Sequence, residues 1–596
     1  MTRNRITHFA SLAALLAITM QPHALWALLA ATLVTMAWWR SPAEATGGLR
    51  LKGVTAATCL LLLIAFSLRW KGTPLPAPLA GRVSSLLASQ AVGAVLALAS
   101  WHAVKRIVAG FLPAALLSVD PSQAAGGATW RDRGFTALLA IVLMTLFSRS
   151  SPLYPLNIWC DANCFFTMGK GIAHGLVPYR DLYEQKGPLL YFLHAATFMV
   201  SNTTFTGVWL LEMACCYAFL RLARRLLAAA GSRSWWMLAA VGTLVAASPC
   251  FSYGDSAEEL CLPLVAWGLW QGLRLVMGQH GRFAVRMMSV GMAIGAIFWI
   301  KYSILGFYVG WTLFFTVHYA RRKQWGRLLR MAGALAAGVV LVSVPIVAYF
   351  ATHNALPHLI EAYFTNNIVH YHTGTDINPG LFYSLTYGAV NAVTESPAFF
   401  IAALAAVAVA YSRRGVWFLL ALSFAATMAL IYFRYPTYVY YPLPVAVFLP
   451  FGLTALWQWT TRMVPLPRWR VAMAATACAL VALCSGNVWH MCQPREQLPQ
   501  YRFAGLIGAS HDTTLLNYGT LDGGFYTVLN QVPRCRFYGT FNLDLPLMTL
   551  EQQRFLDRRR AAWVVTENEP LRHRHYTIAD SARSEDGHWW YLYQRK

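Results

Sequence analysis

Long apolar runs recur along this chain and limit what it can fold into. Each run has roughly 16 to 22 residues, enough to cross a ~30 Å hydrocarbon core as a helix. Of the 596 residues, 57% are hydrophobic and only 12% are charged. A soluble chain of this length needs more polar residues for its surface, so we predict an all-α polytopic membrane protein.

The basic residues lie in short clusters between the apolar runs. The net charge is +24, but this clustering is typical of cytoplasmic loops and not of nucleic-acid binding. We therefore expect no nucleic acid as a partner, and we place the basic turns on the cytoplasmic side of a bacterial cytoplasmic (inner) membrane. These turns fall at 130–133, 221–233, 282–286, 321–323, 413–414 and 462–470.

Because these turns are placed in the cytoplasm, they set the direction in which each apolar run crosses the membrane. With these directions, we predict about 15 spans. The segment 188–202 is short for a crossing, so we expect a helix in the outer interface there, and similarly at 107–118 on the inner side. The predicted spans are 7–20, 24–39, 54–69, 84–103, 134–149, 204–226, 234–251, 258–276, 287–300, 304–320, 328–350, 396–411, 416–433, 440–459 and 471–489.

Three regions follow from this pattern. Residues 1–128 form an N-terminal transmembrane extension, and 129–490 form a core. Residues 491–596 hold 11 of the 24 acids and many turn residues, which predicts a small soluble α/β domain on the extracytoplasmic side. The predicted outer loops of the core are 150–203, 252–257 and 351–395.

Nine of the 13 remaining carboxylates lie at or beside these outer loops. Charged groups near the hydrocarbon core are costly and are kept mainly where they pair or work. The first loop contains Trp159-Cys160-Asp161, then Pro178-Tyr179-Arg180-Asp181, then Lys186-Gly187-Pro188-Leu-Leu-Tyr191. This order resembles the GT-C glycosyltransferases, in particular the bacterial relatives of protein mannosyltransferases and the lipid A aminoarabinose transferase.

The resemblance covers approximately residues 130–460 and shows two departures. Many relatives carry an acidic pair where this chain has Asp161-Ala162, and Lys-Pro-Pro where it has Lys186-Gly187-Pro188. The first departure leaves one candidate base and puts any metal site in doubt. We therefore expect no cofactor, with a divalent metal left open.

The resemblance implies transfer of a sugar from a polyprenyl-phosphate donor to a hydroxyl of a glycan, lipid or protein on the outer face. Asp161 would accept the proton of the acceptor, and the reaction would invert the anomeric carbon. Lys186, Lys301 and Arg180 would bind the donor phosphate. The sugar or acceptor would contact Asp255, Glu258, Glu259, Tyr179, Asp181, Glu184, Tyr438 and Tyr441.

Each residue also has a purely structural interpretation. Asp161 would cap a helix that begins at Ala162, and Lys186 would only reach the headgroups. Glu258 and Glu259 would complement a helix dipole, and the tyrosines would belong to an aromatic belt.

Two other classes of function stay open. A transporter or flippase would place ionisable residues near the bilayer midplane, and among the core acids only Glu212 lies deep in a span. A non-catalytic assembly protein would use the outer domain for partners. Cysteine pairing is also open, as Cys492 with Cys535 or Cys160 with Cys164 or Cys250.

Overall fold

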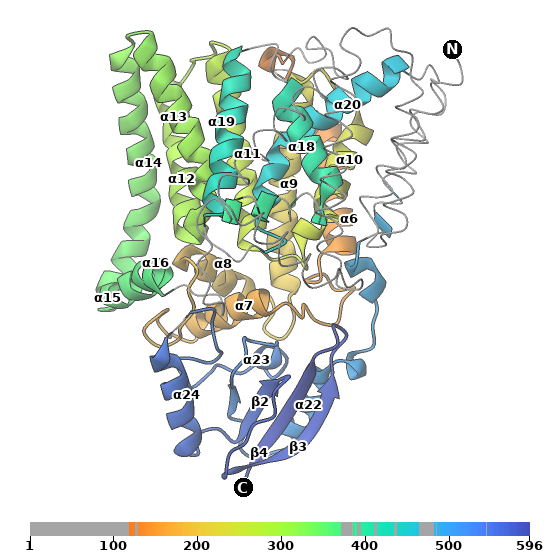
Figure 1. Ribbon diagram of the computed structural model, residues 1–596, viewed down its shortest axis with the longest axis vertical. Helices are drawn as coiled ribbons and strands as arrows, with labels where there is room; N and C mark the ends of the chain where they lie inside the picture. The colour runs from red at the N-terminus through yellow and green to blue at the C-terminus, as the bar shows by residue number, and fades with distance from the viewer. Residues whose placement is uncertain are drawn as a thin grey trace, which may run out of the picture.

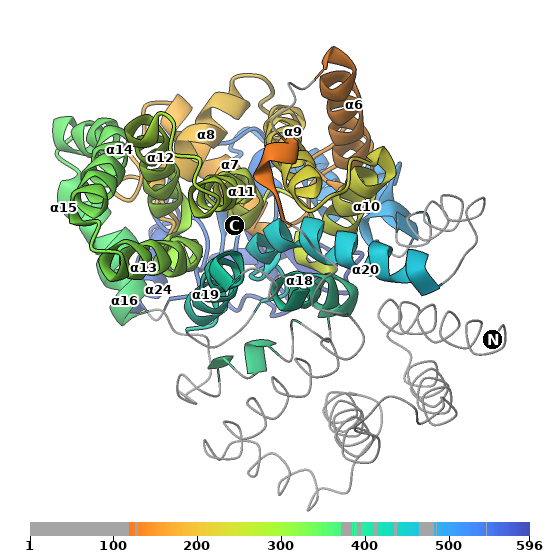
Figure 2. The same cartoon turned by 90° about the horizontal axis from the view of Figure 1, so that it is seen from above.

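The computed structural model describes residues 119–124, 129–370, 395–409, 414–433, 438–463, 485–543 and 545–596, with single residues between 384 and 392 and between 479 and 483. A bundle of long helices stands on two shorter helices, α7 and α8, and a small sheet domain lies beneath them (Figure 1). Seen from above, α11 lies in the middle, with α12 to α14 on one side and α6, α9 and α10 on the other (Figure 2).

The helices of the bundle follow the predicted spans closely. The predicted spans at 7–20, 24–39, 54–69 and 84–103 lie outside the described residues, as do the segment 107–118 and most of the predicted span 471–489. The helices are α6 (Trp130–Phe147), α9 (Thr206–Ala229), α10 (Trp235–Ala246), α11 (Ala257–Val276), α12 (Phe283–Lys301), α13 (Gly306–Arg321), α14 (Trp325–Thr352), α18 (Pro397–Val409), α19 (Arg414–Ile431) and α20 (Leu449–Met463).

Three helical stretches in the described part are long and apolar enough to cross a membrane. They are Thr206–Ala229, Phe283–Arg321 and Trp325–Thr352, and the second contains both α12 and α13. Several other helices are apolar but shorter than 18 residues. The total of about 15 spans therefore stays a prediction from the pattern of basic turns.

Glycines let neighbouring helices of the bundle approach closely. A Cβ atom at Gly291 of α12 would overlap the carbonyl group of Leu335, and one at Gly338 of α14 would overlap that of Met288. Gly306 and Gly310 of α13 meet the backbone of α19 in the same way. Small residues spaced by four allow close backbone contact in an apolar medium, where burial alone gives little drive for association.

Shorter helices lie at the end of the bundle that faces the C-terminal domain. The predicted interface helix at 188–202 is observed as α8, which is shorter and ends at Phe198. Pro188 occupies its first turn, where its missing N–H costs nothing. These elements are α7 (Cys160–Ala173), α8 (Pro188–Phe198), α15 (Leu356–Leu359), the π-helical turn η4 (Ile360–Thr365), α16 (Asn366–Val369) and the 3-10 helix η6 (Leu443–Phe448).

The C-terminal domain is a small α/β unit, as predicted. Its sheet has the order β1-β2-β4-β3, in which β1 pairs parallel to β2 and the other pairs are antiparallel. A register shift between Ile578 and Asp580 bends β3. The elements are α22 (Pro499–Gly508), β1 (Leu515–Asn517), α23 (Phe525–Val528), α24 (Pro546–Asp557), β2 (Trp563–Glu567), β3 (Tyr576–Arg583) and β4 (Trp589–Arg595).

Helix α7 joins this domain to the bundle through polar side chains at helical spacing. The Thr167 hydroxyl donates to Asp522 Oδ2 at 2.7 Å, and Lys170 Nζ donates to the Tyr526 carbonyl at 2.7 Å. Thr527 donates to Asn163 Oδ1 at 2.9 Å. All these side chains are buried, so the contacts replace water on both surfaces.

A second junction uses Arg149, which follows α6. Its guanidinium donates to Asn487 and to Glu585 in the turn between β3 and β4, and it lies 4.7 Å from the ring centre of Tyr253. Both members of the Arg149–Glu585 ion pair are nearly buried. A buried pair is costly to break on one side only, so this turn is held firmly against the bundle.

The structure settles the open question of cysteine pairing, since none of the pairs considered is formed. Cys160, Cys164, Cys250, Cys492 and Cys535 are all free thiols. Small buried thiols such as Cys164 and Cys250 instead pack as core residues.

The junction at α7 predicts a pH dependence of stability. Burial lowers the pKa of Lys170 to about 7, although Asp522 opposes the shift. Between pH 7 and the usual lysine value, the unfolded chain therefore binds a proton that the folded chain releases. The free energy of unfolding should rise with pH across that window.

We expect the melting temperature of the purified protein to rise more between pH 7 and pH 9 than that of Lys170→Met. Lys596→Met, which changes an exposed lysine, is the matched control and should keep the wild-type slope. Equal slopes in the wild type and Lys170→Met would contradict this role of Lys170.

Candidate active site

Asp161 lies in the first turn of α7, near the end of the bundle that faces the C-terminal domain. The helix begins at Cys160 and its N-cap residue is Trp159, so the interpretation of Asp161 as the cap of a helix starting at Ala162 is wrong. Its side chain is 14% exposed and is therefore reachable from outside.

Lys186 reaches the same point from the loop before α8. Its Nζ atom lies 3.7 Å from Asp161 Oδ2 and 3.7 Å from Glu184 Oε1. It also lies 5.6 Å from the ring centre of Phe165 in α7. The predicted base and the predicted phosphate partner are therefore direct neighbours, although 25 positions separate them in the chain.

Lys301 approaches from the end of α12. It forms an ion pair of 2.5 Å with Glu258 Oε1 at the start of α11, and Glu258 is almost fully buried. The Lys301 amine also lies 4.4 Å from the ring centre of Tyr441 and 5.2 Å from that of Tyr440. Glu258 thus helps to place a lysine that remains partly exposed.

Tyr440 connects the two halves of the site. Its hydroxyl donates to Asp161 Oδ2 at 3.2 Å, while Lys301 lies over its ring. The ring also stacks with Tyr438 at 5.7 Å and meets the edge of Trp159 at 5.1 Å. The Asp161 carboxylate, two lysines with their acidic partners, and a group of aromatic rings therefore converge on a single place.

The other predicted residues of the first loop mainly support Lys186. The buried Tyr179 donates to the Lys186 carbonyl at 2.6 Å, and Glu184 accepts from the Lys186 backbone N–H at 2.8 Å and from the Tyr191 hydroxyl. Arg180 instead forms a bidentate pair with Asp181 and donates to the His353 carbonyl. The structure thus gives Arg180 and Asp181 partners of their own, apart from the lysines.

Asp255 and Glu259 lie behind the site and not at its surface. The Asp255 carboxylate is fully buried and binds His194 Nε2 at 3.0 Å, and burial raises the pKa of Asp255. The Asp255 backbone N–H is shared by Glu212 Oε1 and Glu259 Oε2. Asp255 also has a positive φ of 61°, so this network stabilises a strained loop conformation.

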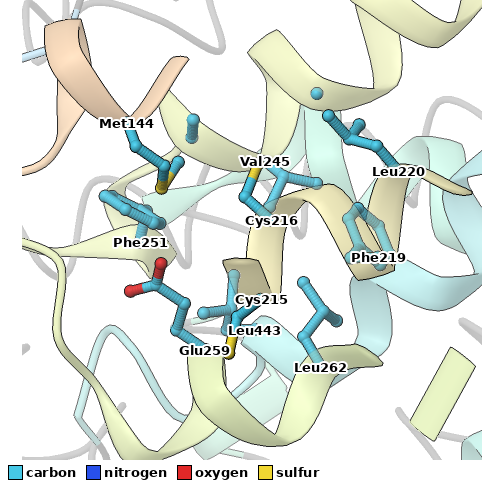
Figure 3. Close-up of a pocket in the computed structure, with 12 residues that line it drawn as sticks. Met144, Cys215, Cys216, Phe219, Leu220, Val245, Phe251, Glu259, Leu262 and Leu443 are labelled. Atoms are coloured by element: carbon cyan, nitrogen blue, oxygen red, sulfur yellow. The ribbon is translucent and has the colours of Figure 1, made fainter. Parts of the chain in front are cut away.

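Glu259 also faces a small apolar cavity between the helices (Figure 3). Met144, Cys215 and Cys216 contribute sulfur atoms to its lining, and Glu259 Oε1 has no hydrogen-bond partner. Within the described residues, no group of three or more histidine, cysteine or acidic side chains is arranged to hold a metal ion.

Sequence reasoning missed Tyr440, Trp159 and His194. Tyr440 lies within the tyrosine-rich stretch that predicted Tyr438 and Tyr441, but spacing alone does not show which ring meets Asp161. Trp159 directly precedes the Cys160-Asp161 pair and offered a local signal. His194 lies in the apolar helix α8 and had no signal before its partner was known.

Comparison with known proteins supports the fold. No protein-family model matches the chain, and no curated protein matches its sequence. Two solved structures of ArnT from Cupriavidus metallidurans match, and each match covers 77% of this chain and 98% of that one. The apo structure has a TM-score of 0.52 at 14% identity, and the one bound to undecaprenyl phosphate 0.49 at 13%.

The apo match shows that the chain has the fold of ArnT, a lipid A aminoarabinose transferase of the GT-C type. The resemblance drawn from the first loop is therefore confirmed at the level of the fold.

Gly187 provides a test of how the site is positioned. Its N–H donates to the Ile300 carbonyl at 3.0 Å, and a Cβ atom there would overlap the Trp299 carbonyl. This contact holds Lys186 next to the end of α12. The added Cβ atom of Gly187→Ala must push the loop that carries Lys186 away from the end of α12.

We expect Gly187→Ala to lower the activity of this site by about 100-fold, since displacing a reacting group by about 1 Å has this effect. Gly505→Ala in α22, where the added Cβ meets nothing within 4 Å, is the control. The activity and the melting temperature of each variant should be measured together. Wild-type activity in Gly187→Ala would show that the contact does not position the site.

Proposed function

We propose that this chain is a GT-C type glycosyltransferase of the bacterial inner membrane. It would move a sugar from a polyprenyl-phosphate donor to a hydroxyl of a glycan, lipid or protein acceptor on the outer face. The observation that carries the proposal is the meeting of Asp161 with Lys186 and Lys301 around Tyr440. The sequence motifs and the ArnT-like fold support the same reaction class.

Each group has a place in a single displacement. Asp161 accepts the proton of the acceptor hydroxyl, whose oxygen forms the new bond to the anomeric carbon. The bond from that carbon to the phosphate oxygen breaks, and polyprenyl phosphate leaves with the bonding electrons. Attack and departure on opposite faces invert the anomeric configuration. No metal ion takes part in these steps as we propose them.

The lysines supply positive charge for the leaving group. Lys186 pairs with Asp161 and Glu184, and Lys301 pairs with Glu258. A bound phosphate would therefore meet two ammonium groups that are already oriented, and it would compete with these carboxylates for them. Preorganised charge of this kind stabilises the transition state without reorganisation during the reaction. An ammonium group suits this task as a compact point charge.

The aromatic rings around Lys301 would receive the sugar or the acceptor. Trp159, Tyr438, Tyr440 and Tyr441 are all partly exposed and contact one another. Flat rings with a hydroxyl edge offer both apolar surface and hydrogen bonding to a polar ring. Because four such rings meet at one place, we propose that they bind a substrate as well as form part of an aromatic belt at the membrane interface.

Asp161→Asn tests the proposed base. The change keeps the shape and the hydrogen bond from Tyr440 but removes the proton acceptor, so transfer from a polyprenyl-phosphate sugar should fall by about 10²- to 10⁴-fold. Asp557→Asn, at an exposed position of α24, should transfer at the wild-type rate.

Purified protein with radiolabelled donor gives the measurement, and the melting temperature reports on folding. Substantial transfer by a folded Asp161→Asn would contradict the assignment. Complete lack of turnover by the wild type with every such donor would favour a transporter or a non-catalytic protein.

Lys186→Met and Lys186→Arg test the proposed phosphate contact. Methionine keeps the apolar stem and removes the charge, so transfer should fall by at least about 10²-fold, the usual effect of losing one charged stabiliser. Arginine keeps the charge and should restore part of the rate. Equal rates for the two variants would show that the charge of Lys186 is not used.

A further inference from the structure

A group of arginines lies at the end of the bundle remote from this site. Helix α9 begins beside α8, where Gly207 meets the Thr197 backbone, and it extends for 24 residues. At 1.5 Å per residue its far end is roughly 36 Å away. Arg221, Arg224 and Arg225 lie in the last turns of this helix, and Arg233 follows in the next turn.

These arginines are close to one another and only partly neutralised. The positive charges of Arg221 and Arg233 repel that of Arg224, and the charge of Arg221 also repels that of Arg225. Asp132 approaches Arg224 at 3.5 Å, but its other oxygen is occupied by the backbone and hydroxyl of Thr129 in a capping box. The cluster therefore attracts a further anion.

Two guanidinium nitrogens of the cluster have no protein partner. Arg221 Nη1 and Arg224 Nη1 are both shielded from solvent and make no hydrogen bond in the described structure. A buried donor of a charged group costs several kilocalories per mole when it is left unsatisfied, so native proteins fill such positions. A hydrogen-bond acceptor from a bound ligand would satisfy both nitrogens.

An apolar stripe starts at the same place. The Arg224 guanidinium lies 4.1 Å from the ring centre of Trp235, and that ring lies 4.6 Å from the ring of Phe135 in α6. Farther along α6, Leu138, Ile141 and Val142 are 59%, 46% and 43% exposed. These positions share one face of the helix and run away from the arginines.

We propose that this surface binds an anionic phospholipid, with its phosphodiester on Arg221 and Arg224 and an acyl chain along α6. The ligand must be negative because the cluster is positive, and it must be amphiphilic because the charged and apolar surfaces are continuous. Basic pockets between transmembrane helices on the inner side are typical sites for such lipids. The site is separate from the proposed transfer reaction.

Delipidated full-length protein in detergent provides the test. Addition of phosphatidylglycerol should raise the melting temperature and appear as bound lipid in native mass spectrometry. Phosphatidylethanolamine, which has no net charge, and inorganic phosphate, which has no acyl chain, should do neither at the same concentration. These comparisons use only the wild type and do not depend on the folding of a variant.

The variant Arg221→Gln/Arg224→Gln should bind phosphatidylglycerol about 30-fold more weakly, since each basic residue near an anionic headgroup contributes about fivefold. The control Arg321→Gln/Arg322→Gln changes two exposed arginines at the end of α13 and should keep the wild-type affinity.

An equal effect of inorganic phosphate would show that the site binds any small anion, and an equal effect of phosphatidylethanolamine would show that the net charge of the lipid is not needed. Either result, or loss of binding in the control alone, would overturn the proposal.

Discussion

The burial of α7 between two parts of the molecule is the constraint on which the rest of the site depends. Nearly every side chain from Ala162 to Gly171 is buried, with Gly169 against the backbone of α8 and Thr167 and Lys170 against the C-terminal domain. A helix held on two sides cannot rotate or slide without losing buried hydrogen bonds. Asp161 in its first turn is therefore placed by contacts several residues away.

The two lysines near Asp161 are held by acidic side chains and yet stay partly exposed. Glu258 is almost fully buried and holds Lys301, and Glu184 holds the backbone of the Lys186 segment. Both lysines nevertheless keep about 13% to 14% of their side chains exposed. The acidic partners therefore orient the two amines, while the exposed part of each lysine stays accessible to a negatively charged ligand.

The sequence predicted the central pair of the site but not its surroundings. Asp161 and Lys186 were found because their motifs lie in one loop and in a characteristic order. Asp255, Glu258 and Glu259 were predicted as one group, yet only Glu258 contacts a lysine of the site. Residues at the start of a helix point in different directions, and the directions depend on neighbours that are remote in sequence.

The sequence by itself determined the helical class of the core, the positions of most helices and the separate C-terminal domain. Apolar run length and the cost of unpaired backbone groups in lipid leave few alternatives, so local patterns suffice. Only the tertiary structure decided that Tyr440 joins Asp161 to Lys301, that Arg149 pairs with Glu585, and that the cysteines among the described residues are free. These outcomes depend on distances between segments up to hundreds of residues apart, which no local pattern encodes.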